Sequence, residues 1–215
     1  ADRLLDLLAA RNRIRWGTLA HDRRLTGVFS DWHNKKVMPC LVSFEAAALM
    51  KRGRLREALD LARATWLPML EQGTQSTFWE WYGSRGGPTN RFASLCHPWS
   101  SPILQRLTEG LSGVRPTGPG YSTFELDPAF AAADHGLKSL EFRIPTLRGA
   151  IRGRWLRKHN RTEYELECPP ETTGVLKKIK GLNIQTLSGK SKSPSVKFKK
   201  RTALILARRG MPIHD

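Results

Sequence analysis

Residues 73–101 read GTQSTFWEWYGSRGGPTNRFASLCHPWSS, and the organisation of the chain turns on them. Apolar segments with helical spacing precede this stretch and short alternating segments follow it, so an α-helical region here gives way to a β region. Within it a carboxylate, Glu80, stands between Trp79 and Trp81, and a His-Pro-Trp sequence follows at 97–99. Aromatic rings cover the apolar faces of a sugar, while carboxylate and imidazole groups meet its hydroxyls. The stretch therefore predicts half of a carbohydrate site.

A plainer interpretation stays open for the same residues, with Trp79 or Trp81 in an ordinary core and Glu80 as a solvated helix residue. Residues 74–76 offer candidate N-caps for a short segment at 77–83, which places Glu80 at the end of an element. The polar and aromatic cluster at 31–33, Asp-Trp-His, is a second candidate on the substrate side.

Amphipathic helices are predicted upstream of this stretch, the first over residues 1–12. Two more, ending near Gly53 and Gly73, form an antiparallel hairpin, and Pro68 should kink the second or weaken its last turn. The inward residues that the spacing predicts are Leu41, Phe44, Ala48 and Leu49 in the first helix of the hairpin and Leu55, Ala58, Leu59, Ala62, Trp66, Met69 and Leu70 in the second.

A further helix is predicted from about Ser100 to Gly110 or Gly113, with Leu104, Leu107 and Leu111 inward. His97 and Trp99 would then precede a helix N-terminus, where oxygen-rich ligands bind well.

The Gly- and Pro-rich sequence GVRPTGPGY at 113–121 marks a domain boundary. Beyond it, short alternating segments separated by turn residues predict an antiparallel two-sheet sandwich with a basic, solvated outer face. The segments are YSTFEL, LKSLEFRI, AIRGRWLR, TEYELEC, TGVLKKI, LNIQTL, SVKFK and TALILA. The sequence thus predicts an α+β chain with domains at 1–113 and 114–215.

The formal net charge of +17 is concentrated near the C-terminus. Residues 151–215 hold 16 Lys and Arg against 5 Asp and Glu, which supplies +11. Such a patch suits phosphate backbones or an anionic surface, but no helix-turn-helix, zinc-finger or RNP-like pattern accompanies it. A nucleic-acid partner is therefore disfavoured.

The chain offers no pattern for a metal, a cofactor or a membrane span. Its three cysteines, Cys40, Cys96 and Cys168, are far apart and odd in number, which argues against a disulfide framework and a zinc site. No apolar run approaches the roughly 20 residues of a spanning helix, and residues 1–16 lack the order of a signal peptide. The compartment, cytoplasmic or secreted, stays open.

Four segments together resemble the C-terminal part of the α-L-rhamnosidases of glycoside hydrolase family 78. They are RGRLREALDLARATWLPMLEQGTQSTFWEWYG, SLCHPWSSPILQRLTEGLSGVRPTGPGY, IPTLRGAIRGRWLRK and EYELECPPETTGVLK, between about Pro39 and Lys178. The resemblance implies the last hairpins of a six-hairpin α/α toroid followed by a small β-sandwich. It also implies hydrolysis of terminal α-L-rhamnosyl residues with inversion.

The resemblance implies a role for four residues. Glu80 falls on the general base and His97 on a histidine that contacts the sugar, with Trp79 and Trp99 shaping the pocket. An inverting site needs a second carboxyl group as the acid, roughly 6.5 to 9.5 Å away. In this family that acid comes from earlier hairpins, and none of the upstream carboxylates Asp22, Asp31 and Glu45 matches its motif.

The partner expected from the resemblance is a rhamnosylated glycoside or polysaccharide, with no membrane and no cofactor. The chain holds about two hairpins before Gly113, so the remainder of the catalytic domain would be needed and the isolated chain is expected to be nearly inactive. Two alternatives stay open: a non-catalytic carbohydrate-binding or scaffold module, and a basic module that binds nucleic acid or a surface. The Lys-rich sequence GKSKSPSVKFKKR is unlike a usual family ending.

Overall fold

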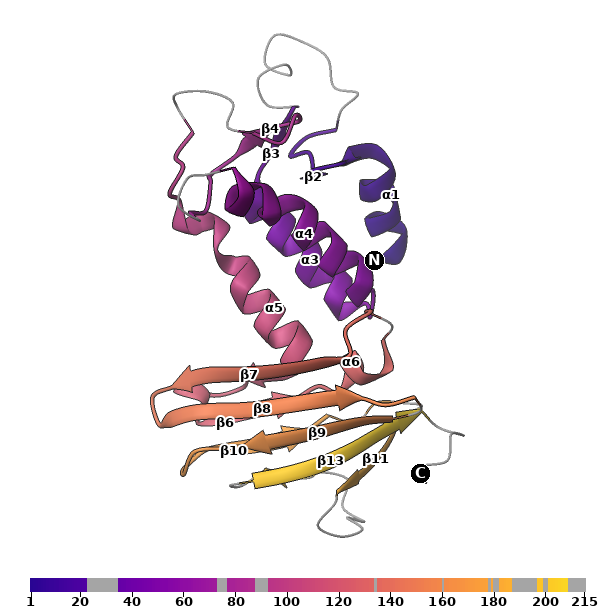
Figure 1. The fold of residues 1–215 in the computed structure, drawn as a ribbon, viewed down its shortest axis with the longest axis vertical. Coiled ribbons are helices and arrows are strands. Elements are labelled where there is room, and N and C mark those ends of the chain that lie inside the picture. Colours follow the sequence, from indigo (N-terminus) through magenta and orange to yellow (C-terminus); the bar gives the residue numbers. More distant parts are fainter. Residues whose placement is uncertain are drawn as a thin grey trace. The chain divides into compact units, whose positions relative to one another are not determined.

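A computed structural model of the 215-residue chain gives the fold drawn in Figure 1. It describes residues 1–22, 35–72, 77–87, 93–133, 135–159, 161–177, 179, 182–186, 197–198 and 201–208. The chain divides into two compact units, unit 1 at Ala1–Arg106 and unit 2 at Leu107–Asp215. Within the described ranges no helix combines the length and the apolar character that crossing a membrane requires.

Unit 1 consists of helices and two short strand pairs, β1 with β2 and β3 with β4. Its last helix, α5, continues across the boundary into unit 2. The elements are α1 Asp2–Asn12, β1 Arg13–Ile14, β2 Gly17–Thr18, β3 Lys36–Val37, α3 Pro39–Lys51, α4 Leu55–Glu71, β4 Tyr82–Gly83, the 3-10 turn η1 Pro98–Ser100 and α5 Pro102–Ser112.

Helices α3 and α4 form the hairpin that the sequence predicts, side by side in Figure 1. Gly53 ends α3 with φ +73°, a left-handed conformation that suits glycine at a helix C-terminus. The Arg54 N–H donates to the Leu49 carbonyl at 2.9 Å and completes the cap. Helix α4 continues through Pro68 to Glu71, so the proline lies in its last turn.

The buried face of α3 differs from the one predicted. Val42, Ala46 and Leu49 are buried, whereas Leu41 and Phe44 are 46% and 57% exposed. Almost every side of α3 is apolar, so its spacing does not select a single inward face. The other predicted stripes fail in the same way at Leu70 of α4 and Leu104 of α5, which are also exposed.

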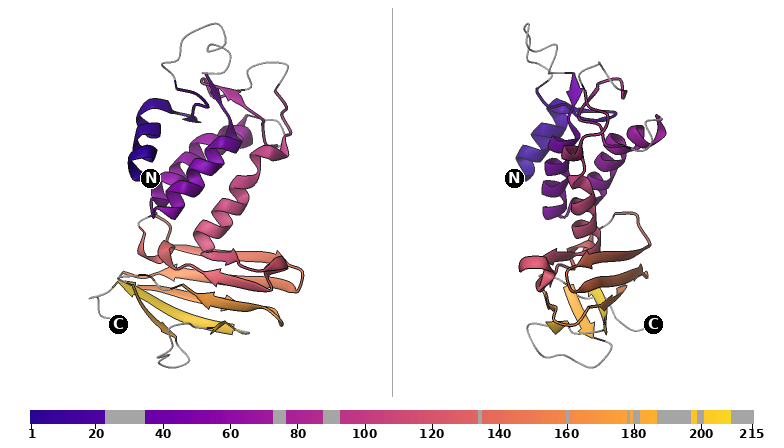
Figure 2. Two further views of the ribbon diagram at one scale, coloured as in Figure 1. Left: turned by 180° about the vertical axis from the view of Figure 1, so that it is seen from behind. Right: turned by 90° about the vertical axis from the view of Figure 1, so that its left-hand side faces the viewer.

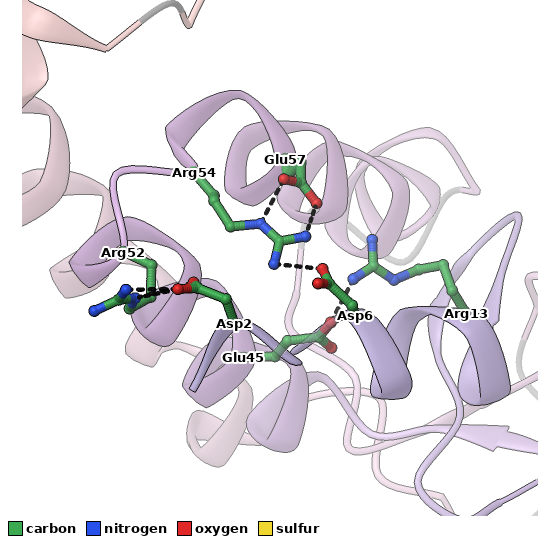
Figure 3. Close-up of polar contacts among 7 residues, drawn as sticks. All are labelled: Asp2, Asp6, Arg13, Glu45, Arg52, Arg54 and Glu57. Atoms are coloured by element: carbon green, nitrogen blue, oxygen red, sulfur yellow. Dashed lines mark hydrogen bonds and ion pairs between the residues drawn. The ribbon is translucent and has the colours of Figure 1, made fainter. Parts of the chain in front are cut away.

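Ion pairs join α1 and the strand after it to the hairpin, as Figure 3 shows. The Arg54 guanidinium contacts both Asp6 and Glu57. A further pair, Arg13 with the buried Glu45, lies below the surface. The pairs are Asp2–Arg52, Asp6–Arg54, Arg54–Glu57 and Arg13–Glu45. These contacts fix the direction of α1 along the hairpin.

Residues 77–83 are not helical: Glu80 lies at a bend and Tyr82–Gly83 form β4, so the interpretation of Glu80 as a helix residue was wrong. Tyr82 and Gly83 pair with Val37 and Lys36, because the β-favouring aromatic residues of this segment find a partner strand far away in the sequence. The expected N-caps at 74–76 lie outside the described residues.

Unit 2 contains two sheets in a sandwich-like arrangement, visible as two layers in Figures 1 and 2. One has the order β12-β10-β6-β5 and the other β11-β13-β9-β8-β7. The elements are β5 Val114–Pro116, η2 Pro119–Tyr121, β6 Thr123–Leu126, α6 Ala129–Ala132, β7 Ser139–Thr146, β8 Gly149–Arg157, β9 Arg161–Glu167, β10 Thr173–Leu176, β11 Leu182–Thr186, β12 Lys197–Phe198 and β13 Arg201–Arg208.

Every predicted strand segment contains a strand, and one expectation needs correction. The Gly- and Pro-rich sequence at 113–121 holds β5, which pairs with β6. Strands β6 and β10 are parallel, so the fold is not purely antiparallel. Side chains along β8 and β9 alternate between the two faces of the sheet. Trp155 and Tyr164 lie opposite each other on the buried face, while their neighbours in these strands point outward.

Gly113 and Gly53 allow a matched test of these helix ends. Both have φ near +75°, but a Cβ on Gly113 would lie 2.4 Å from the Asp127 carbonyl oxygen, whereas nothing lies within 4 Å of one on Gly53. We expect Gly53→Ala to cost about 1 kcal/mol and Gly113→Ala at least twice that. Denaturant titrations, with amide exchange read for each unit, measure the difference. Equal costs would show that the Asp127 contact relaxes freely.

Candidate functional site

Glu80 is held in unit 1 by contacts with Ser94. The Glu80 N–H donates to the Ser94 carbonyl at 2.9 Å, and the Ser94 N–H donates to Glu80 Oε2 at 3.1 Å. The side chain is 22% exposed, so the carboxylate is partly screened from water yet reachable. One oxygen is thus occupied by the backbone, and Oε1 is the oxygen that faces His97.

His97 faces this carboxylate through one ring nitrogen. The backbone N–H of His97 donates to the Phe78 carbonyl at 2.7 Å, which ties the residue to the segment that carries Glu80. The ring nitrogen Nδ1 of His97 accepts a hydrogen bond from the backbone N–H of Trp99 at 3.2 Å and so caps η1. A neutral imidazole that accepts at Nδ1 carries its proton on Nε2. That nitrogen lies 3.9 Å from Glu80 Oε1, too far for a direct hydrogen bond.

The two tryptophans predicted to contact a sugar lie in different environments. Trp99 is 55% exposed, and its ring centroid lies 5.6 Å from that of His97. Trp79 is completely buried and packs edge-on against Tyr82. The prediction of a sugar contact for Trp79 is therefore revised: its ring has no face open to a ligand and supports the site from below.

Sequence reasoning missed Lys36 of β3, which is buried close to Glu80. Its Nζ lies 4.6 Å from the centre of the Trp81 ring, a cation–π arrangement. Burial lowers the pKa of Lys36, and the charge of Glu80 opposes that shift. No spacing in the sequence connects Lys36 with Glu80, because the β3–β4 pairing brings them together.

Two of the upstream carboxylates have structural partners. Glu45 pairs with Arg13 and Asp22 lies 3.7 Å from Arg11. Asp31 and its neighbours Trp32 and His33 lie outside the described residues. Within the described residues, therefore, Glu80 and His97 are the predicted site residues that the fold brings together with an exposed ring, that of Trp99.

This arrangement suits a ligand rich in hydroxyl groups. Glu80 Oε1 accepts a hydrogen bond, the Nε2–H of His97 donates one, and the 3.9 Å between them leaves each open to a ligand oxygen. The exposed ring of Trp99 offers an apolar surface beside them. A carboxylate in this position is also able to take a proton from water.

Substitution of each tryptophan distinguishes the buried ring of Trp79 from the exposed ring of Trp99. Trp79→Ala empties a fully buried position and should cost about 3–5 kcal/mol of unfolding free energy. Trp99→Ala should cost no more than about 0.5 kcal/mol, because most of its ring already contacts water. Denaturant titration of both variants measures the difference, and similar losses would mean that Trp99 is part of the core.

Comparisons with known proteins agree with this fold. Residues 113–181 match the family described as the bacterial alpha-L-rhamnosidase C-terminal domain. No curated protein sequence matches the chain. Among solved structures, the alpha-L-rhamnosidase from Dictyoglumus thermophilum is 16% identical with a TM-score of 0.58, over 77% of this chain and 20% of that one.

Two further structures are similar. The alpha-L-rhamnosidase from Aspergillus terreus is 18% identical with a TM-score of 0.55, over 80% of this chain and 19% of that one. The family 78 rhamnosidase of Bacillus sp. GL1 is 25% identical with a TM-score of 0.54, over 65% and 15%. The chain thus spans about a fifth or less of each of these proteins. Residues 113–181 therefore match the family's C-terminal domain, and the chain shares its fold with part of these α-L-rhamnosidase structures.

Proposed function

We propose that Glu80 is the general base of an inverting hydrolase that releases terminal α-L-rhamnosyl residues. The observation that carries the proposal is the geometry of the carboxylate: Ser94 fixes Oε2, and Oε1 faces His97 across 3.9 Å. A base must be held in place while its free oxygen takes a proton from the attacking water. The similarity of the fold to α-L-rhamnosidases supports the choice of rhamnose.

His97 and Trp99 then position the sugar. The Nε2–H of His97 donates to a sugar hydroxyl. The backbone N–H of Trp99 occupies Nδ1, so a neutral ring carries its proton on Nε2. The exposed Trp99 ring covers an apolar face of the sugar. Trp79 acts as a positioning residue beneath them, since its carbonyl accepts the Ser100 hydroxyl at 2.6 Å and so joins the Glu80 segment to η1.

The general acid comes from another part of the catalytic domain in this proposal. Inversion requires a second carboxyl group roughly 6.5 to 9.5 Å from the base, with room for the water between them. Within the described residues Glu45 and Asp22 are already paired with arginines. The helices of unit 1 would form the last hairpins of an α/α toroid whose earlier hairpins supply the acid.

The exposed apolar side chains of unit 1 support the proposal that other hairpins complete the catalytic domain. Large apolar residues on three helices are between 42% and 68% exposed, an unusual density for a finished surface. They are Leu4 and Leu7 of α1, Leu41 and Phe44 of α3, and Leu67 and Leu70 of α4. We propose that further helices of the same catalytic domain pack on them.

The substitution Glu80→Gln tests the base. Glutamine keeps an oxygen for the Ser94 N–H but does not take a proton, so in the complete enzyme kcat should fall by about 10² to 10⁴ with KM nearly unchanged. Initial rates on an aryl α-L-rhamnoside, with NMR of the first anomer released, measure rate and stereochemistry. Azide should restore turnover to Glu80→Ala as a rhamnosyl azide of inverted configuration. Full activity in Glu80→Gln would refute the assignment.

The same substrate distinguishes an enzyme from a binding module. The isolated chain should hydrolyse it at a rate close to that of its Glu80→Gln variant. Turnover that only the wild-type chain shows would mean that an acid is already present in it. Retained rhamnose binding without turnover in the complete protein would favour the non-catalytic carbohydrate-binding alternative.

Substitutions on α3 test the apolar face. Phe44→Ser and Leu41→Gln should change the free energy of unfolding by less than about 0.5 kcal/mol, because both side chains are already exposed. They should also reduce self-association of the isolated chain, measured by light scattering. The control Leu49→Ala, at a position 1% exposed on the same helix, should cost about 2–5 kcal/mol. A Phe44→Ser loss as large as that of Leu49→Ala would contradict the proposal.

A further inference from the structure

The outer face of the five-stranded sheet in unit 2 carries a trench between two rows of charged side chains. Strand register places Glu141, Arg154 and Glu165 in one row across β7, β8 and β9. It places Arg143, Arg152 and Glu167 in the other, two residues away on each strand. These six residues, with Phe142, Gly153 and Leu166 between the rows, line a hollow of about 480 Å³, which we call the charged trench.

Alternation along the strands explains its shape. Residues two apart on a strand point to the same face, so the two rows stand about 7 Å apart. The row between them, Phe142, Gly153 and Leu166, turns its side chains to the other face and leaves backbone as the floor. Crossing three adjacent strands gives the trench a length of about 10 Å, which suits one or two sugar rings. The three strands are neighbours in Figure 1.

The charges of the two rows differ. In the first row Arg154 Nη2 lies 2.8 Å from Glu165 Oε1, and Glu165, with a smaller contribution from Glu141, raises the pKa of Arg154. This row is acidic by one charge. In the second row Arg143 stands directly opposite Arg152, and within the described residues neither takes part in an ion pair. This row is basic by one charge.

Two arginines directly opposite each other on one face repel, which destabilises a strand pair. An oxyanion between their guanidinium groups removes the repulsion and accepts hydrogen bonds from both planar forks. The facing row offers carboxylate oxygens, which accept hydrogen bonds from hydroxyl groups. A ligand that satisfies both rows carries one carboxylate and several hydroxyls.

We propose that the charged trench binds an acidic saccharide, with a uronate carboxylate on Arg143 and Arg152 and sugar hydroxyls on Glu141 and Glu165. The three carboxylates of the trench balance its three guanidinium groups, so a nucleic-acid backbone with its repeated phosphates fits less well than a ligand with one anionic group. The site lies in unit 2 and does not depend on the role proposed for Glu80. It also gives part of the basic charge of residues 151–215 a purpose, through Arg152 and Arg154.

Calorimetric titration of the whole chain with a galacturonate trisaccharide tests the proposal. Arg143→Gln and Arg152→Gln should each weaken binding by at least about tenfold, the effect of losing one charge-assisted contact. The matched control is Arg148→Gln, which makes the same change at an exposed position in the turn between β7 and β8 and should stay within about twofold. Unchanged melting temperatures confirm that all three variants remain folded.

Two further arms identify the chemistry of the ligand. The methyl ester of the same trisaccharide lacks the anion and should bind at least about tenfold more weakly. Glu141→Gln should weaken binding of the trisaccharide but not of acetate, which has no hydroxyls. Equal binding of the ester, equal binding of inorganic sulfate, tighter binding of single-stranded DNA, or an equal loss in Arg148→Gln would each overturn the proposal. Absence of trisaccharide binding at millimolar concentration would do the same.

Discussion

Burial of the Trp79 ring is the constraint on which the candidate site depends. The ring is fully enclosed, and the backbone on either side of it is fixed, with the Trp79 N–H on Met69 Sδ at 3.5 Å and its carbonyl on the Ser100 hydroxyl. Trp79 is enclosed, whereas Glu80, the next residue in the chain, is 22% exposed. Ser94 and His97 contact Glu80 from the segment 94–97. The enclosed Trp79 therefore holds the backbone from which the Glu80 side chain extends.

In unit 2 the buried aromatic residues and the charged residues likewise lie on opposite faces of one sheet. Trp155 and Tyr164 are buried on one face of its sheet, and each anchors its polar atom on a backbone carbonyl near the end of α5, Leu111 for Trp155 and Ser112 for Tyr164. Burial holds the pKa of the Tyr164 hydroxyl well above its usual range, so this group stays neutral. The opposite face is left to charged residues, which the fold does not need for its core.

The sequence predicts elements well and orientations poorly, for physical reasons. The hairpin with its turn at Gly53 and the strands of unit 2 follow from periodicity and turn residues, which are local. The exposed Phe44 could not be predicted, because α3 is apolar on nearly all sides and only its surroundings select a face. Lys36 was missed since strand pairing joins it to a distant segment. Glu80 and His97 were predicted as site residues from their motif, and that role stays a prediction. The burial of Trp79 depends on packing that no spacing records.

The pairing of β13 with β9 bears on where the C-terminal domain ends. The matched family region stops at residue 181, yet β13, at Arg201–Arg208, lies inside the sheet between β11 and β9. Seven residue pairs join β13 to β9. A polypeptide cut at residue 181 would leave the whole of β9 as an open edge of unpaired N–H and carbonyl groups, a template for aggregation. Any excised version of this domain therefore has to extend through Arg208.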